Sequence, residues 1–144
     1  MYIQPDIQER VTRFLDSKQS NMADALGIAF TSFKMDELKA TMPVDERTIQ
    51  PFGILHGGAS VALAETLASV GAWLNVKEAG KTAVGIEINA NHIRPVKNGG
   101  EVQGISVPVR RGRRIQVWKT EIFTPENKLV CVSRCTLAIV RQSR

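Results

Sequence analysis

The stretch from Gly57 to about Val76 constrains the fold of this chain more than any other. It is rich in helix-forming residues and apolar nearly all round, and between Ala59 and Val76 the only ionisable side chain is Glu65. A helix that is apolar on every face is buried on every face. Glu65 and scattered polar residues interrupt the apolar runs, so no window reaches the roughly 18 to 20 apolar residues of a membrane span. The rest of the chain must therefore surround this helix.

Strand-like segments flank the helix on both sides. The later ones are joined by turn residues, including Asn98-Gly99-Gly100 and Gly112. One long buried helix with about six antiparallel strands predicts an α+β fold in which a curved sheet wraps around the helix. The expected strands are 28–34, 38–44, 82–93, 101–109, 115–123 and 129–140.

The N-terminal segment carries helical signals. Asp6 followed by Glu9 resembles a capping box, and apolar residues then recur at helical spacing, which predicts an amphipathic helix to about Ser17. A short helical turn is expected over 22–26, and the aperiodic segment 45–55 is expected to form a loop. No repeat, linker or low-complexity tract divides the chain, so all 144 residues are expected to form a single domain.

The net charge of +5 is compatible with several classes of anionic partner. The basic residues are scattered except for a cluster at 110–114, and aromatic residues, which would stack on bases, make up only 6% of the chain. We therefore expect no nucleic-acid partner. An anionic small molecule would account for the cluster equally well.

Cysteine usage and the N-terminus bear on location. Cys131 and Cys135 are four residues apart in a strand-like segment, about 13 Å when extended, which is too far for a disulfide. With only two histidines besides, at 56 and 92, no zinc-type cluster can be assembled, and we expect no metal. The first residues carry acids and lack an apolar core, so no signal peptide is expected. These features favour a reducing cytoplasm.

Glu65 is the first candidate for chemistry. Burying an unpaired carboxylate costs several kcal/mol, so such a group has either a charged partner or a chemical role. A structural ion pair, or a helix end reaching solvent, would explain it about as well as catalysis. Ser69 lies four residues on, on the same helix face, and could hydrogen-bond the carboxylate; a small packing residue is the alternative.

The start of the helix is the second candidate. In His56-Gly57-Gly58, free backbone N–H groups could hold a carbonyl oxygen as it becomes an oxyanion, although a plain glycine-containing helix start is the alternative. Gly57 and Glu65 are eight residues apart, about 12 Å along a helix. One carbonyl cannot touch both groups of a single chain. If both act on it, two helices must lie antiparallel across a two-fold axis, which predicts an obligatory homodimer.

Three segments together resemble a known family. Gln50-Pro51-Phe52-Gly53-Ile54-Leu55-His56-Gly57-Gly58-Ala59 with Ala64-Glu65 resembles the signature of hotdog-fold thioesterases of the PaaI-like superfamily, and 89–96 and Gln116-Val117-Trp118 are also similar to it. Within it, the similarity is to aryl-CoA, 1,4-dihydroxy-2-naphthoyl-CoA and enterobactin-proofreading thioesterases. The resemblance covers roughly residues 6 to 140. It implies a single hotdog domain that hydrolyses acyl-CoA, with coenzyme A part of the substrate, no cofactor, and a homotetrameric assembly.

The resemblance also implies a role for each motif residue. Glu65 would be the nucleophile or the general base that activates water, and the Gly57 N–H would polarise the thioester carbonyl. Gln50 would orient that carbonyl or the water. His56 would lie beside the thioester or the leaving sulfur, and Ser69 would support the carboxylate.

Substrate-binding candidates lie on the later strands. Counted by twos, His92 is in phase with Val84, Ile86, Ile88 and Ala90, which favours a core histidine; the resemblance implies instead that it lines the acyl or pantetheine end of the pocket.

Arginines around Gly112 could bind the phosphates of coenzyme A in bidentate fashion, although a solvated basic turn is the alternative. The candidates are Arg94, Arg110, Arg111, Arg113 and Arg114.

Three functions are compatible with these features. The leading one is hydrolysis of an acyl-CoA, aromatic by the resemblance, or of a carrier-protein thioester. The second is a non-catalytic acyl-CoA-binding module, which would not need the helix carboxylate. The third is a hotdog hydratase or dehydratase, which would use an Asp and His pair, whereas the helix has no Asp.

Overall fold

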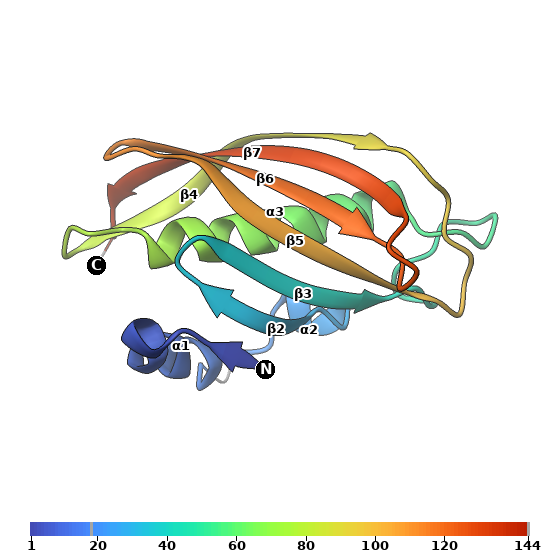
Figure 1. The fold of residues 1–144 in the computed structure, drawn as a ribbon, viewed down its shortest axis with the longest axis horizontal. Coiled ribbons are helices and arrows are strands. Elements are labelled where there is room, and N and C mark those ends of the chain that lie inside the picture. Colours follow the sequence, from blue (N-terminus) through green and yellow to red (C-terminus); the bar gives the residue numbers. More distant parts are fainter. Residues whose placement is uncertain (18, 144) are drawn as a thin grey trace.

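The computed structural model describes residues 1–17 and 19–143. A curved sheet wraps around the long helix α3 (Gly57–Leu74), as Figure 1 shows. The α+β hotdog arrangement expected from the sequence is therefore confirmed. The strands are β1 (Tyr2–Ile3), β2 (Ala29–Lys34), β3 (Glu37–Pro43), β4 (Lys81–His92), β5 (Glu101–Arg111), β6 (Ile115–Phe123) and β7 (Leu129–Arg141).

The sheet has seven strands in the order β1-β2-β3-β5-β6-β7-β4. The six expected strands are present and pair antiparallel. The seventh, β1, was not expected; it pairs with β2 in parallel and makes the sheet mixed. A two-residue strand is too short to show any alternation of apolar and polar residues, so its sequence carries no strand signal.

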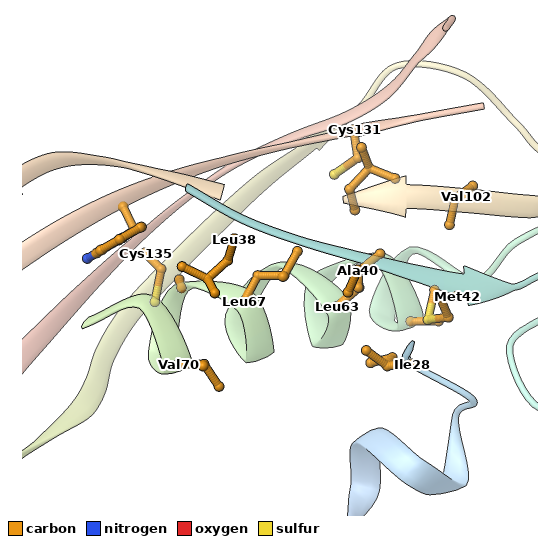
Figure 2. Close-up of a cluster of buried hydrophobic side chains, with 14 of the residues drawn as sticks. Ile28, Leu38, Ala40, Met42, Leu63, Leu67, Val70, Val102, Cys131 and Cys135 are labelled. Carbon is orange, nitrogen blue, oxygen red and sulfur yellow. The ribbon is translucent and has the colours of Figure 1, made fainter. Parts of the chain in front are cut away.

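The core lies between α3 and the concave face of the sheet. Leu63 and Leu67 of α3 are fully buried against Leu38 and Met42 of β3, and Figure 2 shows these side chains meeting. Each such leucine stabilises the fold by about 1.5–3 kcal/mol. The two cysteines of β7, also shown in Figure 2, are free, as their spacing predicts, and both are buried.

Trp118 of β6 fixes how closely the sheet approaches the helix. A Cβ atom on Gly71 would lie 2.7 Å from the Trp118 ring, so only glycine fits there. The Trp118 indole N–H donates to the Gln116 side chain at 2.9 Å, and the Gln116 amide donates to the Ala72 carbonyl at 3.2 Å. Gln116-Val117-Trp118 thus joins strand and helix.

The N-terminal prediction is correct in kind but wrong in its cap. Pro5 opens a 3₁₀ turn, η1 (Pro5–Ile7), and α1 (Gln8–Leu15) follows it with no side-chain cap. Proline favours the first helical position, which places Asp6 inside the turn and not before it. The Glu9 carboxylate pairs with Arg13 one turn on. The capping box present at this end is Asn21 with Asp24, on α2 (Met22–Ala25).

The predicted phase of β4 is also wrong. β4 pairs with β7, and the register skips one residue between Gly85 and Glu87, so Ile86 is the extra residue of a β-bulge. Beyond the bulge, Ile88 and Ala90 pack toward the core, whereas Val84 and Ile86 are exposed. His92 therefore does not share a face with Val84 and Ile86, because a single inserted residue reverses the alternation.

In the described part of the chain, no helix is long and apolar enough to cross a membrane.

Candidate active site

Glu65 lies in the middle of α3 and is half-buried. It lines a cavity of about 630 Å³, together with Ser69 one turn on. The other walls come mainly from the N-terminal segment and β2, including Phe14, Met22 and Phe30. None of the ion pairs found within residues 1–17 and 19–143 includes Glu65. The structural ion pair considered as an alternative is therefore absent from the described residues.

Ser69 shares the cavity with Glu65 but does not hold its carboxylate. Among the described residues, no hydrogen bond links the two side chains. The Glu65 carboxylate lies instead against the backbone of Gly85 in β4: a Cβ atom on Gly85 would be 2.6 Å from Glu65 Oε1. The charge of Glu65 also affects the pKa of the Cys135 thiol in β7. Burial, followed by the charges of Glu65 and Glu87, raises the pKa of the Cys135 thiol to about 11, so this thiol stays protonated at neutral pH.

His56 caps the N-terminus of α3. Its Nδ1 accepts from the Gly58 N–H at 2.7 Å, and its carbonyl accepts from the N–H groups of Ala59 and Ser60. The Gly57 N–H is then the one amide of the first turn with no acceptor among the residues that the structure describes. It is half-buried and free to bind an incoming oxygen, which is what an oxyanion site needs.

The ring of His92, at the end of β4, lies against Gly57. A Cβ atom on Gly57 would be 2.7 Å from His92 Nε2, so the His92 ring would have to shift to accept any larger residue at this position. His92 is exposed in the single chain. It is thus neither a core histidine nor part of the cavity beside Glu65.

Gln50 lies in the loop before α3 and is half-buried. Its side-chain oxygen accepts from the Phe52 N–H, and its backbone N–H donates to the Ile54 carbonyl at 2.9 Å. The turn therefore occupies the amide oxygen, and the amide nitrogen is the group that can donate to a ligand.

The residues expected at the site fall into two groups. Gly57, His56 and His92 gather at the N-terminus of α3, whereas Glu65 and Ser69 line the cavity farther along. The helix is continuous from Gly57 to Leu74, so Gly57 and Glu65 are about 12 Å apart along its axis. One chain thus presents two half-sites.

The candidate arginines also lie in two separate places, at the two ends of α3. Arg111 donates to Asn75 at 3.3 Å, and Arg113 pairs with Glu78 at 2.9 Å, so the β5–β6 hairpin lies at the C-terminal end of α3. Arg94 follows His92 at the opposite end. All of the arginines at 94, 110, 111, 113 and 114 are exposed.

Two residues that make contacts with α3, Gly85 and Arg10, were not predicted from the sequence. Gly85 stands inside a strand, where a glycine signals a bulge or a close backbone approach, so a signal was present. The sequence around Arg10 carried no such signal. Its guanidinium donates to the carbonyls of Trp73, Leu74 and Val76 and lies 4.4 Å from the Trp73 ring. Burial lowers the pKa of Arg10. It closes the C-terminal end of α3, and such a contact depends on tertiary packing alone.

Comparison with known proteins bears on this arrangement. Residues 52–131 match the family model described as the thioesterase superfamily. A putative esterase of Haemophilus influenzae is 56% identical over 115 residues, covering 80% of this chain and 82% of the relative. The 1,4-dihydroxy-2-naphthoyl-CoA hydrolase of Escherichia coli is 50% identical over 122 residues, covering 85% of this chain and 88% of the relative.

A solved structure agrees with these relatives. The crystal structure of a thioesterase from Haemophilus influenzae superposes with a TM-score of 0.81 at 50% identity, covering 92% of this chain and 90% of the other. The match extends over the helix that carries Glu65 and the sheet around it. This chain belongs to the thioesterase superfamily and is a thioester hydrolase with a hotdog fold.

Proposed function

We propose that this protein hydrolyses acyl-CoA thioesters, aromatic ones in particular, at a site assembled from two copies of the chain. The observation that carries the proposal is the Glu65 carboxylate: it is half-buried in an otherwise apolar helix, has no ion-pair partner in the described residues, and lines a cavity of about 630 Å³. A carboxylate held in this way is suited to attack a carbonyl or to activate water.

The proposed reaction uses both half-sites. Glu65, as nucleophile or as general base for water, drives attack on the thioester carbonyl carbon. The Gly57 N–H stabilises the negative charge that develops on the carbonyl oxygen, and Gln50 orients the carbonyl or the water. The carbon–sulfur bond then breaks and coenzyme A leaves as the thiol. In the general-base route, Glu65 passes to the sulfur the proton that it took from water, and the free acid forms directly. In the nucleophile route, water supplies that proton and then hydrolyses the mixed anhydride formed on Glu65 to the free acid. The chemistry needs neither a metal nor a redox cofactor.

His56 is suited to assist the leaving group. Because its Nδ1 accepts a hydrogen bond from the Gly58 N–H, the proton of the neutral ring lies on Nε2. The exposed Nε2–H can therefore donate toward the sulfur beside the helix N-terminus. Ser69 and His92 are proposed to line the site next to Glu65 and next to Gly57, respectively.

Two copies are needed because the half-sites are about 12 Å apart on one helix. The edge strand β4 offers the surface for pairing, since it is the last strand of the sheet and exposes Val84 and Ile86 at 42% and 59%. An exposed apolar edge favours pairing with a second chain. We propose an antiparallel β4–β4 dimer in which Gly57 of one copy faces Glu65 of the other; its further pairing into a homotetramer stays a prediction.

The lining of the cavity supports an aromatic acyl group as the proposed substrate class. Phe14, Phe30 and Met22 give it an apolar wall suited to a flat aromatic group. The Escherichia coli relative is named for an aromatic acyl-CoA, which supports the same class. A carrier-protein thioester would present the same reacting group.

We further propose that the exposed arginines bind the phosphates of coenzyme A. The two free thiols also suit a location in a reducing cytoplasm.

The test is free-thiol release from a panel of aryl-, fatty- and short-chain acyl-CoAs, with the purified protein compared with Glu65→Gln. We expect turnover of aryl-CoA, reduced about 100- to 10,000-fold in the variant while the circular dichroism spectrum is unchanged. Glu126→Gln, in the exposed β6–β7 turn, is the matched control and keeps full activity. Binding of acyl-CoA without release would favour the binding module, and substrate consumed without free thiol would favour the hydratase.

A further inference from the structure

The contact between Glu65 and Gly85 is closer than any side chain would allow. A Cβ atom on Gly85 would lie 2.6 Å from Glu65 Oε1 and 3.7 Å from the carboxyl carbon. Gly85 is not one of the glycines with a positive φ, which are Gly27, Gly53, Gly80 and Gly99. Its backbone is thus one that other residues adopt, and the reason for glycine here is space.

The bulge next to Gly85 makes this contact compatible with the one at Gly57. In β4, Gly85 pairs with the buried Leu137 and His92 pairs with the buried Cys131, so both face α3. They are seven positions apart, and in a regular strand residues an odd number apart face opposite sides. The extra residue at Ile86 removes this conflict. One strand can then meet Glu65 at one point and Gly57 at another.

We propose that Gly85, together with the bulge at Ile86, is a positioning residue for the Glu65 carboxylate. The absent side chain leaves the space that the carboxylate occupies, and the bulge aims that space at the middle of α3. This inference rests on the proposed function, since it assigns Gly85 to the reaction through Glu65. A glycine inside a strand weakens the strand, so its presence is explained by the close approach.

Gly85→Ala tests the proposal, because the added methyl group meets only the far end of the flexible Glu65 side chain. We expect the chain to fold and the carboxylate to move by the order of an ångström. Misplacement of a reacting group by about 1 Å costs about 100-fold in rate. The kcat for aryl-CoA should therefore fall by about that factor, with KM changed less than about threefold, since positioning of the carboxylate acts on the chemical step.

Gly100→Ala is the matched control. The neighbours of its added methyl group begin at 3.5 Å, an ordinary contact, and its φ is not positive. It should keep both kcat and KM. An unchanged kcat in Gly85→Ala, or an equal loss in Gly100→Ala, would overturn the proposal.

A double-mutant cycle on the urea midpoint tests the contact without any turnover. We expect Gly85→Ala to lower the midpoint in the wild-type background and not in the Glu65→Ala background, where the obstructing carboxylate is gone. If Gly85→Ala fails to fold, folding of the double variant supports the contact, and failure of both overturns it. A wild-type protein without turnover would refute the proposed function, while this cycle still decides whether Gly85 makes room for Glu65.

Discussion

The amide of Gly57 can be removed with little change to its helix. Gly57 is the first residue of α3, where proline is favoured, and His56 before it has φ −70° and ψ 128°, a conformation compatible with a following proline. Gly57→Pro therefore deletes the N–H while the helix persists. We expect kcat to fall about 100- to 1,000-fold, as for loss of one oxyanion donor. Thiol release from the aryl-CoA substrate measures it.

Gly57→Ala is the control for that variant. It brings the same Cβ atom against His92 but keeps the N–H. The difference between the two variants therefore isolates the donor from the steric effect, and the alanine variant should retain at least about ten times the activity of the proline variant. Equal losses in both would mean that packing against His92, and not the amide, governs the rate.

Among the elements, the link between α3 and β4 shows how a surface carboxylate joins three segments. Glu78 accepts hydrogen bonds from Lys81 of β4 at 2.6 Å and from Arg113 of the β5–β6 hairpin at 2.9 Å. These bonds lower the pKa of Glu78 from its ordinary value of 4.5 to about 2, and the bond from Lys81 has the larger effect. The pair with Arg113 also shows that this arginine has a partner within the chain.

The stabilisation from Glu78 should depend on pH in a defined direction. Because its pKa is lower in the folded chain, the unfolded chain binds more protons between pH 4.5 and about 2. The contribution is complete above the unfolded pKa and disappears as the pH falls toward 2. The urea midpoint of Glu78→Gln should thus lie below that of the wild type at pH 7 and approach it at low pH. About 1 M salt, with a Debye length of about 3 Å, should shrink the gap at pH 7; a gap independent of pH would contradict the ion pair.

The elements also show what the sequence could and could not predict. Alternation and turn residues were enough for six strands, and the apolar run was enough for α3, because each signal is local. β1 was too short to carry a signal. The bulge at Ile86 was missed because counting by twos assumes a regular strand, although Gly85 was a cue. The position of the arginine hairpin at the far end of α3 depends on the sheet order, which no local pattern encodes.

At the scale of the whole molecule, the proposed reaction uses two groups that the continuous helix α3 holds apart. Gly57 and Glu65 stand on one rigid element with about 12 Å between them, and no rotation of side chains closes that distance. A two-fold arrangement would supply each site with one group from each copy. Variants in the two groups should then complement each other, which no site within a single chain would allow.

Mixing Glu65→Gln with Gly57→Pro tests this sharing. When equal amounts are unfolded together and refolded, half of the dimers contain one chain of each kind. Each mixed dimer has one site with both groups intact and one site with neither, so the mixture should recover about one quarter of the wild-type activity. Each variant refolded alone should stay inactive, and mixing folded proteins without exchange of subunits should recover nothing. If the refolded mixture is no more active than the mean of the two variants refolded separately, Glu65 and Gly57 do not act on the same carbonyl from two copies. Recovery near one quarter would instead make the antiparallel pairing of two helices part of the catalytic site, and the exposed edge of β4 the surface that brings them together.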